Sequence, residues 1–332
     1  MNADRFVGNA SFGWTFRVLV AGGLLLLILR SLDLGELRQV MVAPRWEPML
    51  GMAVAALAFR LLGAAKIWIM LSAFAPEVRL RTVLRDGLIA LSLGTFTPGS
   101  LGDFSLVRFL RREGILVHQG FSAMLVDRGI TLALTVLVYL PMTLLLVAPS
   151  REWLWLPVGC GMALVIGLGL NLMPSVRQRL LQLLVRPALP RLENFLRATS
   201  ELLRQHPLHV LANVGVTLIR SLVSGLAIVL GLLAAGSTSQ LSQSHLLSVV
   251  ALTNSLNLLN ALPISIRGLG VYEGSALVAF SFIGLKLKPE HVFAAFVFLR
   301  VYVVLSSLIV LAFASLFMRG HGPVAAPAKA EA

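Results

Sequence analysis

Apolar residues in this chain are grouped into stretches that are long enough to cross a membrane as helices. Six of these stretches are expected to be full spans: 14–32, 48–74, 120–147, 153–173, 209–235 and 292–318. A helix needs about 20 mostly apolar residues to cross a hydrocarbon layer of about 30 Å. Helices satisfy their own backbone hydrogen bonds in lipid, whereas open strands do not. The pattern therefore predicts a helical membrane protein.

Two further apolar stretches, near 86–112 and 246–285, are interrupted by proline, glycine and charge. The first contains the sequence TPGSLGD at Thr97–Asp103, and the second contains LPISIRGLGVYE at Leu262–Glu273. A short apolar run, a break and a return to charge are typical of a hairpin that enters and leaves the membrane on one face. The predicted fold class is an all-α polytopic membrane protein with about six full transmembrane helices plus two re-entrant or broken helical hairpins. Eight thinner crossings are the competing topology.

The two broken stretches resemble one another. Each has a proline, a glycine, an acid and, in the next span, an arginine: Pro98, Gly102, Asp103 and Arg128 in the first, and Pro263, Gly270, Glu273 and Arg300 in the second. The arginine follows the acid by 25 residues in the first and by 27 in the second. On the topology above, the hairpins enter from opposite faces. This pattern is typical of an inverted repeat with a binding site at the midplane of the membrane.

Composition supports the membrane assignment. Hydrophobic residues make up 57% of the 332 residues and charged residues 13%, and the mean hydropathy is +0.86. Charged residues make up about a quarter of a soluble domain. The net charge is +13, and the basic residues that produce it lie between the apolar stretches. Basic residues in these places indicate the topology of the chain in the membrane and contact with anionic lipid, not binding to nucleic acid.

One transmembrane domain is expected at 14–318, between a short N-terminus at 1–13 and a disordered tail at 319–332. Between 174 and 207, arginines alternate with leucines, which is typical of amphipathic helices on a membrane surface. Lysine and arginine are concentrated in this segment and in 79–112. By the positive-inside rule this face is cytoplasmic. We expect a multi-pass protein of the cell (inner) membrane with both termini in the cytoplasm.

Charged residues within or at the edge of the apolar stretches are the candidates for chemistry: Arg60, Lys66, Asp103, Asp127, Arg128, Arg220, Arg267, Glu273 and Arg300. Each costs roughly 2.5–3.5 kcal/mol at the centre of a bilayer, so we expect these side chains to converge. The six bases outnumber the three acids, and a phosphate can offset the surplus. The structural alternative is that the arginines pair with carboxylates and carbonyl groups only to hold the bundle together.

The binding hypothesis places a headgroup phosphate between Arg128, Arg267 and Arg300. Amides at the helix starts after Gly102 and Gly270 orient the phosphate. When the site is empty, Asp103 and Glu273 hold the arginines. Further candidates are Arg60, Lys66, Arg220, Asp127 and Asn257. No metal-ligand spacing is found, and no GxSxG motif or P-loop, so neither a metal, a cofactor nor a catalytic residue is expected.

The two broken motifs, with Asp127, Arg128 and Arg300 downstream, resemble the lysylphosphatidylglycerol synthase transmembrane family. This is the flippase-like domain of the multiple peptide resistance factor, which also occurs as stand-alone proteins. The resemblance covers roughly residues 14 to 318. It implies a bacterial or archaeal inner-membrane protein that translocates lipids, in the founding members an aminoacylated phosphatidylglycerol.

The sequence departs from the family pattern in three ways. The aminoacyltransferase domain of the full-length synthases is absent, so we expect no lysyl transfer and no enzyme. Asp103 stands where glutamate is commoner, and Tyr272 stands where arginine is commoner. These changes leave the identity of the lipid headgroup undetermined, since stand-alone relatives are linked to hopanoid, glycolipid and polyprenyl-phosphate pathways.

The expected function is a flippase-like lipid translocase that moves a phosphate-bearing headgroup between leaflets by alternating access at a cationic midplane site. The expected partners are an anionic phospholipid or polyprenyl-phosphate-type lipid and the membrane. A lipid-modifying enzyme and a second copy of the chain stay open as partners. The alternative is a non-transporting lipid-binding accessory subunit of a lipid-modifying, glycolipid or hopanoid pathway enzyme. A third function, an intramembrane transferase, requires Asp103 or Glu273 as its base.

Overall fold

The computed structural model describes residues 18–96, 101–112, 114–147, 189–237, 243–261, 268–282 and 287–318. Within these ranges the chain is helical and contains no strand. The helices are Val18–Ser31, α2 (Leu34–Val42), α3 (Trp46–Ser72), α4 (Leu80–Phe96), α5 (Leu101–Arg112), α6 (Val117–Leu134), the π-helical segment η1 (Thr135–Tyr139), α7 (Leu140–Val147), α10 (Leu189–Gln205), α11 (Pro207–Ala234), α12 (Gln243–Ala261), α13 (Val271–Phe282) and α14 (Pro289–Met318). The all-α fold class is confirmed for the described residues.

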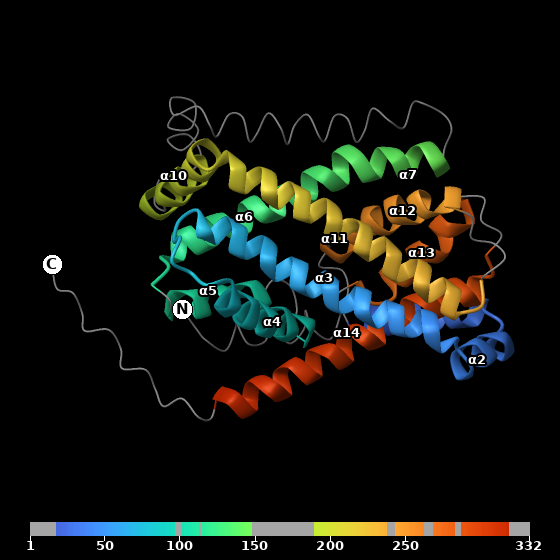
Figure 1. Cartoon of the computed structure of the whole chain (residues 1–332). Coiled ribbons are helices and arrows are strands. Elements are labelled where there is room, and N and C mark those ends of the chain that lie inside the picture. Colours follow the sequence, from blue (N-terminus) through green and yellow to red (C-terminus); the bar gives the residue numbers. More distant parts are fainter. Residues whose placement is uncertain are drawn as a thin grey trace, which may run out of the picture.

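Long helices form the centre of the bundle (Figure 1). Helices α3 and α11 lie side by side and run antiparallel, with Gly51 of α3 beside Leu230 of α11 and Phe59 beside Arg220. Helix α14 packs on both. Buried apolar side chains lie around this centre in three clusters, one towards the end with α10 and two towards the end with α2.

Four described helices are long and apolar enough to cross a membrane: Trp46–Ser72, Val117–Leu146, Pro207–Ala234 and Pro289–Ser315. The spans predicted at these four places are confirmed as helices to within a few residues. Helices Val18–Ser31 and Leu34–Val42 meet at 102° and would add a fifth span if they are counted as one. The span predicted at 153–173 lies outside the described residues, so the predicted total of about six is not confirmed.

Helix α2 lies between the first two predicted spans. Asp33 begins the helix, because its carboxylate accepts hydrogen bonds from the backbone N–H groups of Gly35 (2.8 Å) and Glu36 (3.1 Å). Lys288 donates to the Glu36 carboxylate at 2.5 Å, and the backbone N–H of Asp33 donates to Glu290 at 2.9 Å. The pairing raises the pKa of Lys288. These contacts tie α2 to the start of α14.

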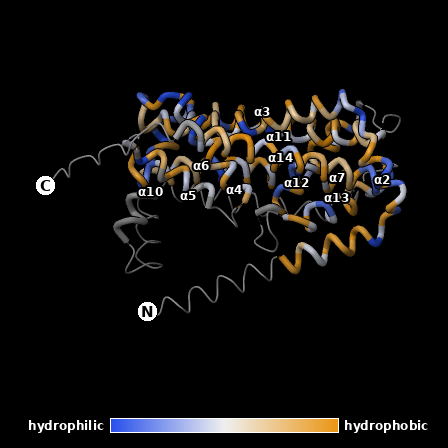
Figure 2. The backbone as a smooth tube through the Cα atoms, turned by 90° about the horizontal axis from the view of Figure 1, so that it is seen from below, coloured by the Kyte–Doolittle hydropathy of each residue, from blue (hydrophilic) through white to orange (hydrophobic). Residues whose placement is uncertain are grey.

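The two broken stretches form pairs of short helices that pack against each other, α4 with α5 and α12 with α13. Figures 1 and 2 place the first pair in the half of the bundle that carries α10 and the second pair in the half that carries α2. Helices α5 and α13 have 12 residues each, or about 18 Å, which is too short to cross a bilayer. Hydrophilic residues gather at the two ends of the bundle (Figure 2).

Helix α10 is amphipathic where its side chains are described. Ala198 and Leu202 are buried against the rest of the bundle, whereas Arg197 and Arg204 are exposed. The apolar face of the helix thus packs on the protein, and its position on a membrane surface stays a prediction. Residues 174–188 of the predicted amphipathic segment lie outside the described residues.

Helices α11 and α12 approach closely at Gly225. A Cβ atom at this position would lie 2.7 Å from the Cα of Val250 and 2.4 Å from its Cγ2. Backbone cannot move away as a flexible side chain can, so only glycine fits here. Small residues serve in this way at helix contacts in membranes.

Gly225→Ala should therefore destabilise the protein by about 1–3 kcal/mol, the usual cost of overpacking a helix contact. The matched control is Gly215→Ala on the same helix, where a Cβ would meet nothing within 4 Å. We expect the control to be neutral or slightly stabilising, because alanine favours helix. The unfolding temperature of the two purified variants in detergent measures the difference, and equal temperatures would contradict the prediction.

Candidate functional site

A buried ion pair joins α3 to α6. The Nζ of Lys66 lies 3.0 Å from Oδ1 of Asp127, and the lysine side chain is 0% exposed. Lys66 also donates to Oγ1 of Thr131 at 2.9 Å. The hydroxyl of Thr131 donates to the backbone carbonyl of Asp127, one helical turn earlier, at 2.9 Å. Thr131 therefore accepts from the ammonium group and fixes its direction.

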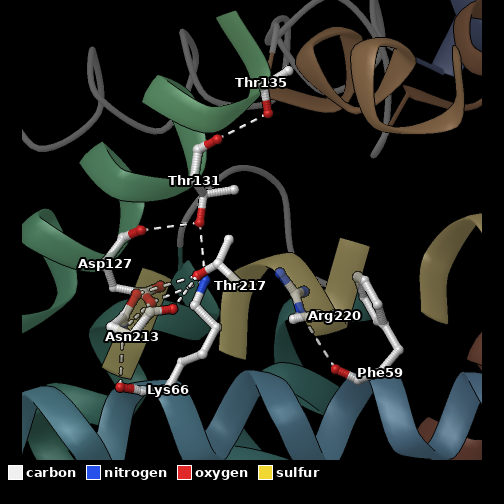
Figure 3. Close-up of polar contacts among 8 residues, drawn as sticks. All are labelled: Phe59, Lys66, Asp127, Thr131, Thr135, Asn213, Thr217 and Arg220. Carbon is white, nitrogen blue, oxygen red and sulfur yellow. Dashed lines mark hydrogen bonds and ion pairs between the residues drawn. The ribbon is translucent and has the colours of Figure 1, made fainter. Parts of the chain in front are cut away.

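Helix α11 completes this cluster with an amide (Figure 3). The Nδ2 of Asn213 donates to Oδ1 of Asp127 at 2.9 Å and to the backbone carbonyl of Lys66 at 3.2 Å. One turn further on, the hydroxyl of Thr217 bonds to the backbone carbonyl of Asn213 at 2.7 Å. Three helices thus meet at one charged centre that hydrogen bonds hold together. We call Lys66, Asp127, Thr131, Asn213 and Thr217 the Lys–Asp cluster.

Two arginines lie near the Lys–Asp cluster. Arg220 lies apart from it over α3 in Figure 3, where its Nε donates to the carbonyl of Phe59 at 3.2 Å and its guanidinium stacks 3.8 Å from the centre of the Phe59 ring. Its charge interacts with Asp127. Arg128 is exposed on α6, and both arginines are close enough to repel Lys66. The neighbourhood of the carboxylate is therefore cationic.

Arg60 is buried where α3 meets α4 and α14. Its guanidinium donates to Oγ of Ser92 at 3.2 Å, to the carbonyl of Val303 at 2.6 Å and to Oγ of Ser307 at 2.5 Å. Ser307 in turn bonds to the hydroxyl of Thr95 at 2.9 Å. Hydroxyl groups and a carbonyl thus surround a cation at the middle of three packed helices.

A second ion pair joins α13 to α14. The Nη2 of Arg300 lies 2.5 Å from Oε1 of Glu273, whose side chain is only 2% exposed. The other oxygen, Oε2, accepts from the backbone N–H of Gly270 at 2.7 Å. Glu273 therefore caps the start of its own helix while it holds the arginine. That N–H is consequently not open to an outside anion in this arrangement.

An apolar cavity of about 710 Å³ lies beside this second pair. It is lined by helix Val18–Ser31 and by α7, α12 and α13, including Gly274 of α13 and Gly270 just before that helix. Its walls carry mainly leucine, with Thr143 and Ser255 bonded to one another at 2.9 Å. A space of this size is in the range that holds a ligand of moderate size.

Gly270 lies between the Glu273–Arg300 pair and helix Val18–Ser31. Its φ of +79° is a conformation that side chains disfavour, and a Cβ would lie 2.8 Å from the Cβ of Leu24. Gly270→Ala should lower the unfolding temperature in detergent, with a cost of about 1–3 kcal/mol from strain and contact. Gly274→Ala is the control, because its Cβ would meet only the flexible end of Ile28 at 3.3 Å. Equal stability of the two variants would be the contrary result.

The structure brings some of the predicted site residues together. Glu273 contacts both Arg300 and Gly270, and the hydroxyl of Tyr272 donates to Oδ1 of Asn257 at 3.5 Å. Gly102 packs against α4, where a Cβ would lie 2.6 Å from the Cα of Gly94.

Other site predictions fall outside what the structure describes. Arg267 and the side chain of Asp103 lie outside the described residues. The hypothesis of a phosphate between Arg128, Arg267 and Arg300 therefore stays a prediction.

Three members of the Lys–Asp cluster, Thr131, Asn213 and Thr217, were not predicted from the sequence. Their signal is spacing: Asn213 and Thr217 are four apart in an apolar span, as are Asp127 and Thr131. Polar residues at that spacing share one helix face, and a shared polar face inside a membrane span indicates a buried contact. A search for such pairs would have found the cluster.

The long apolar helices and the cations inside them define a multi-pass membrane protein with a charged interior. The sequence model described as "Lysylphosphatidylglycerol synthase TM region" matches residues 14–310. The chain therefore belongs to this family, as its motifs suggested, and the family indicates a function connected with membrane lipids. No curated protein and no solved structure matches the chain significantly.

Proposed function

We propose that this protein is a lipid translocase that moves a phosphate-bearing headgroup between the leaflets of a membrane. The observation that carries the proposal is a surplus of positive charge inside the bundle. Away from its ends, the described interior holds the buried cations Arg60 and Lys66, the half-buried cations Arg220 and Arg300 and, among carboxylates, the buried Asp127 and Glu273. Asp86 is also buried, but its neighbour Arg85 offsets its charge at 2.8 Å.

An anion is the natural partner of this surplus. Buried charges that are not offset cost several kcal/mol each, and the anionic group that a bilayer offers in quantity is lipid phosphate. Arginine presents a planar set of donors that suits phosphate oxygens. The guanidinium groups of Arg60, Arg220 and Arg300 come from α3, α11 and α14, which pack on one another. They supply successive contacts along the middle of the bundle.

The positions of the short helix pairs support alternating access. Pairs α4–α5 and α12–α13 lie in opposite halves of the bundle (Figure 2), as two re-entrant hairpins from opposite faces would. The α10 end is cytoplasmic in this proposal, because exposed Arg197 and Arg204 lie there and basic residues face the cytoplasm. Movement of one pair at a time opens the cationic interior to one leaflet, and the chain carries out no chemistry on the lipid.

Purified protein in liposomes tests the proposal. Fluorescent phosphatidylglycerol is placed in both leaflets, and a membrane-impermeant quencher is added outside. We expect inner-leaflet lipid to move to the outer leaflet and be quenched in proteoliposomes but not in protein-free liposomes. Fluorescent phosphatidylcholine, which has no net charge, should move more slowly. Equal quenching with and without protein would overturn the proposal and favour the lipid-binding accessory subunit.

A further inference from the structure

We infer that Asp127 is a proton-binding site and that a proton binds there together with the phosphate of the translocated lipid. The inference rests on the proposed function and adds an energy source to it, since uptake of a proton with each lipid couples lipid movement to a proton gradient. The carboxylate, its partners and the surrounding charges carry the argument in turn.

The hydrogen bonds of the Lys–Asp cluster distinguish the two oxygens of Asp127. Oδ1 accepts from the Nζ of Lys66 at 3.0 Å and from the Nδ2 of Asn213 at 2.9 Å. The second donor direction of the Asn213 amide is taken by the backbone carbonyl of Lys66 at 3.2 Å. The amide is therefore a donor on this side, and Oδ1 is an acceptor only.

Oδ2 is the oxygen that can take a proton. The side chain of Asp127 is 11% exposed, whereas that of Lys66 is 0% exposed. The described contacts of this carboxylate fall on Oδ1 and none of them on Oδ2. A proton from water can form an O–H bond there without breaking either hydrogen bond on Oδ1. The lysine stays an ammonium ion, and the cluster keeps its shape while its charge changes.

Charges around Asp127 connect this proton to an anion. The groups that face it are Lys66 from α3, Arg220 from α11 and Arg128 from α6 itself. Helices α5 and α10 also pack on α6, and no described charged side chain of theirs pairs with Asp127. The four groups carry a net charge of +2 when Asp127 is ionised. Protonation raises it to +3, which strengthens the attraction for an entering phosphate.

Coupling of this kind is reciprocal. If the proton increases the affinity for phosphate, the phosphate increases the affinity for the proton by the same factor. A headgroup that enters beside Lys66 therefore draws a proton onto Oδ2, and the proton leaves when the headgroup leaves. Inward and outward states of the translocase would then exchange one proton per lipid.

Proton uptake on binding tests the inference directly. Purified protein in a weakly buffered detergent solution is mixed with a short-chain phosphatidylglycerol, and a pH indicator records the protons taken up. We expect the wild type to take up protons when the lipid binds. A parallel titration with inorganic phosphate separates recognition of the headgroup from recognition of the free ion. Binding without proton uptake at any pH would overturn the inference.

Two variants locate the proton. Asp127→Asn keeps an oxygen that accepts from Lys66 and Asn213 and places an amide where the protonated oxygen would be. It should bind the lipid with less proton uptake than the wild type. Asp86→Asn replaces another buried carboxylate, on α4, and should keep the uptake of the wild type. Equal uptake by Asp127→Asn and wild type would overturn the assignment.

Wild-type protein alone also tests the inference if Asp127→Asn does not fold. Its affinity for the short-chain lipid should rise as the pH falls, and a constant affinity would overturn the coupling. Proteoliposomes separate the two proposals. If lipid moves at the same rate with and without an imposed pH gradient, the result contradicts proton coupling but not the proposal that the protein is a translocase. Proton uptake on binding without any lipid movement supports the proton site and contradicts the translocase.

Discussion

Lys66→Met should destabilise the folded protein by about 3–5 kcal/mol, the cost of leaving one member of a buried ion pair without its partner. The carboxylate of Asp127 would lose the ammonium at 3.0 Å, and Thr131 would lose the donor at 2.9 Å. Methionine fills a similar volume, so the loss reflects charge more than packing. Denaturant unfolding in detergent, followed by far-UV circular dichroism, measures the change.

A double variant separates the pair from its individual members. In Lys66→Met/Asp127→Asn the buried charge is gone, and the new amide oxygen still accepts from Asn213. We expect this variant to recover most of the stability lost by Lys66→Met, because neutral replacement of a buried pair is often tolerated. A double variant as unstable as the single one would show that the two residues are not energetically coupled.

Arg300→Gln should reduce lipid movement at least about 30-fold, because truncation of one partner of a buried charge pair costs about 2–5 kcal/mol. The substitution removes a cation from the proposed path and leaves Glu273, at 2% exposure, without its partner at 2.5 Å. Quenching rates in proteoliposomes measure the loss. Arg300→Lys should keep part of the activity, because lysine keeps the positive charge. It should not keep all of it, because lysine lacks the planar set of donors.

The variant Glu273→Gln/Arg300→Gln distinguishes transport from stability. Both buried charges are removed, and the new amides can bond to one another and to the N–H of Gly270. We expect normal membrane insertion and an unfolding temperature close to that of the wild type, with lipid movement still lost. Recovery of transport in this variant would show that Arg300 serves only to hold α13 against α14.

Hydropathy predicted the long helices because a span requires length and apolarity, and both are local properties of the sequence. It did not predict that α2 is a helix, since nine residues are too few for a span and the contacts that hold its start come from Glu290 and Lys288, far along the chain. The Asp33 cap was nevertheless a local signal for its start.

The site was predicted in part for the same reason. Charged residues in apolar stretches pointed to Lys66, Asp127, Glu273 and Arg300, because their cost in lipid is a property of each residue. Which residues pair depends on the packing of helices far apart in sequence. Asn213, 86 residues from Asp127, became a partner only through the contact of α11 with α6.

The π-helical turn at Thr135–Tyr139 divides the long span Val117–Leu146 into two rods. Its backbone bond from the N–H of Leu140 to the carbonyl of Thr135 spans five residues, one more than an α-helix uses. An inserted residue turns everything beyond it by about 100° about the helix axis. That rotation sets the register between Asp127 on one rod and Thr143, facing the apolar cavity, on the other. Shortening the turn by one residue would swing the second rod away from Ser255 without altering a single charge.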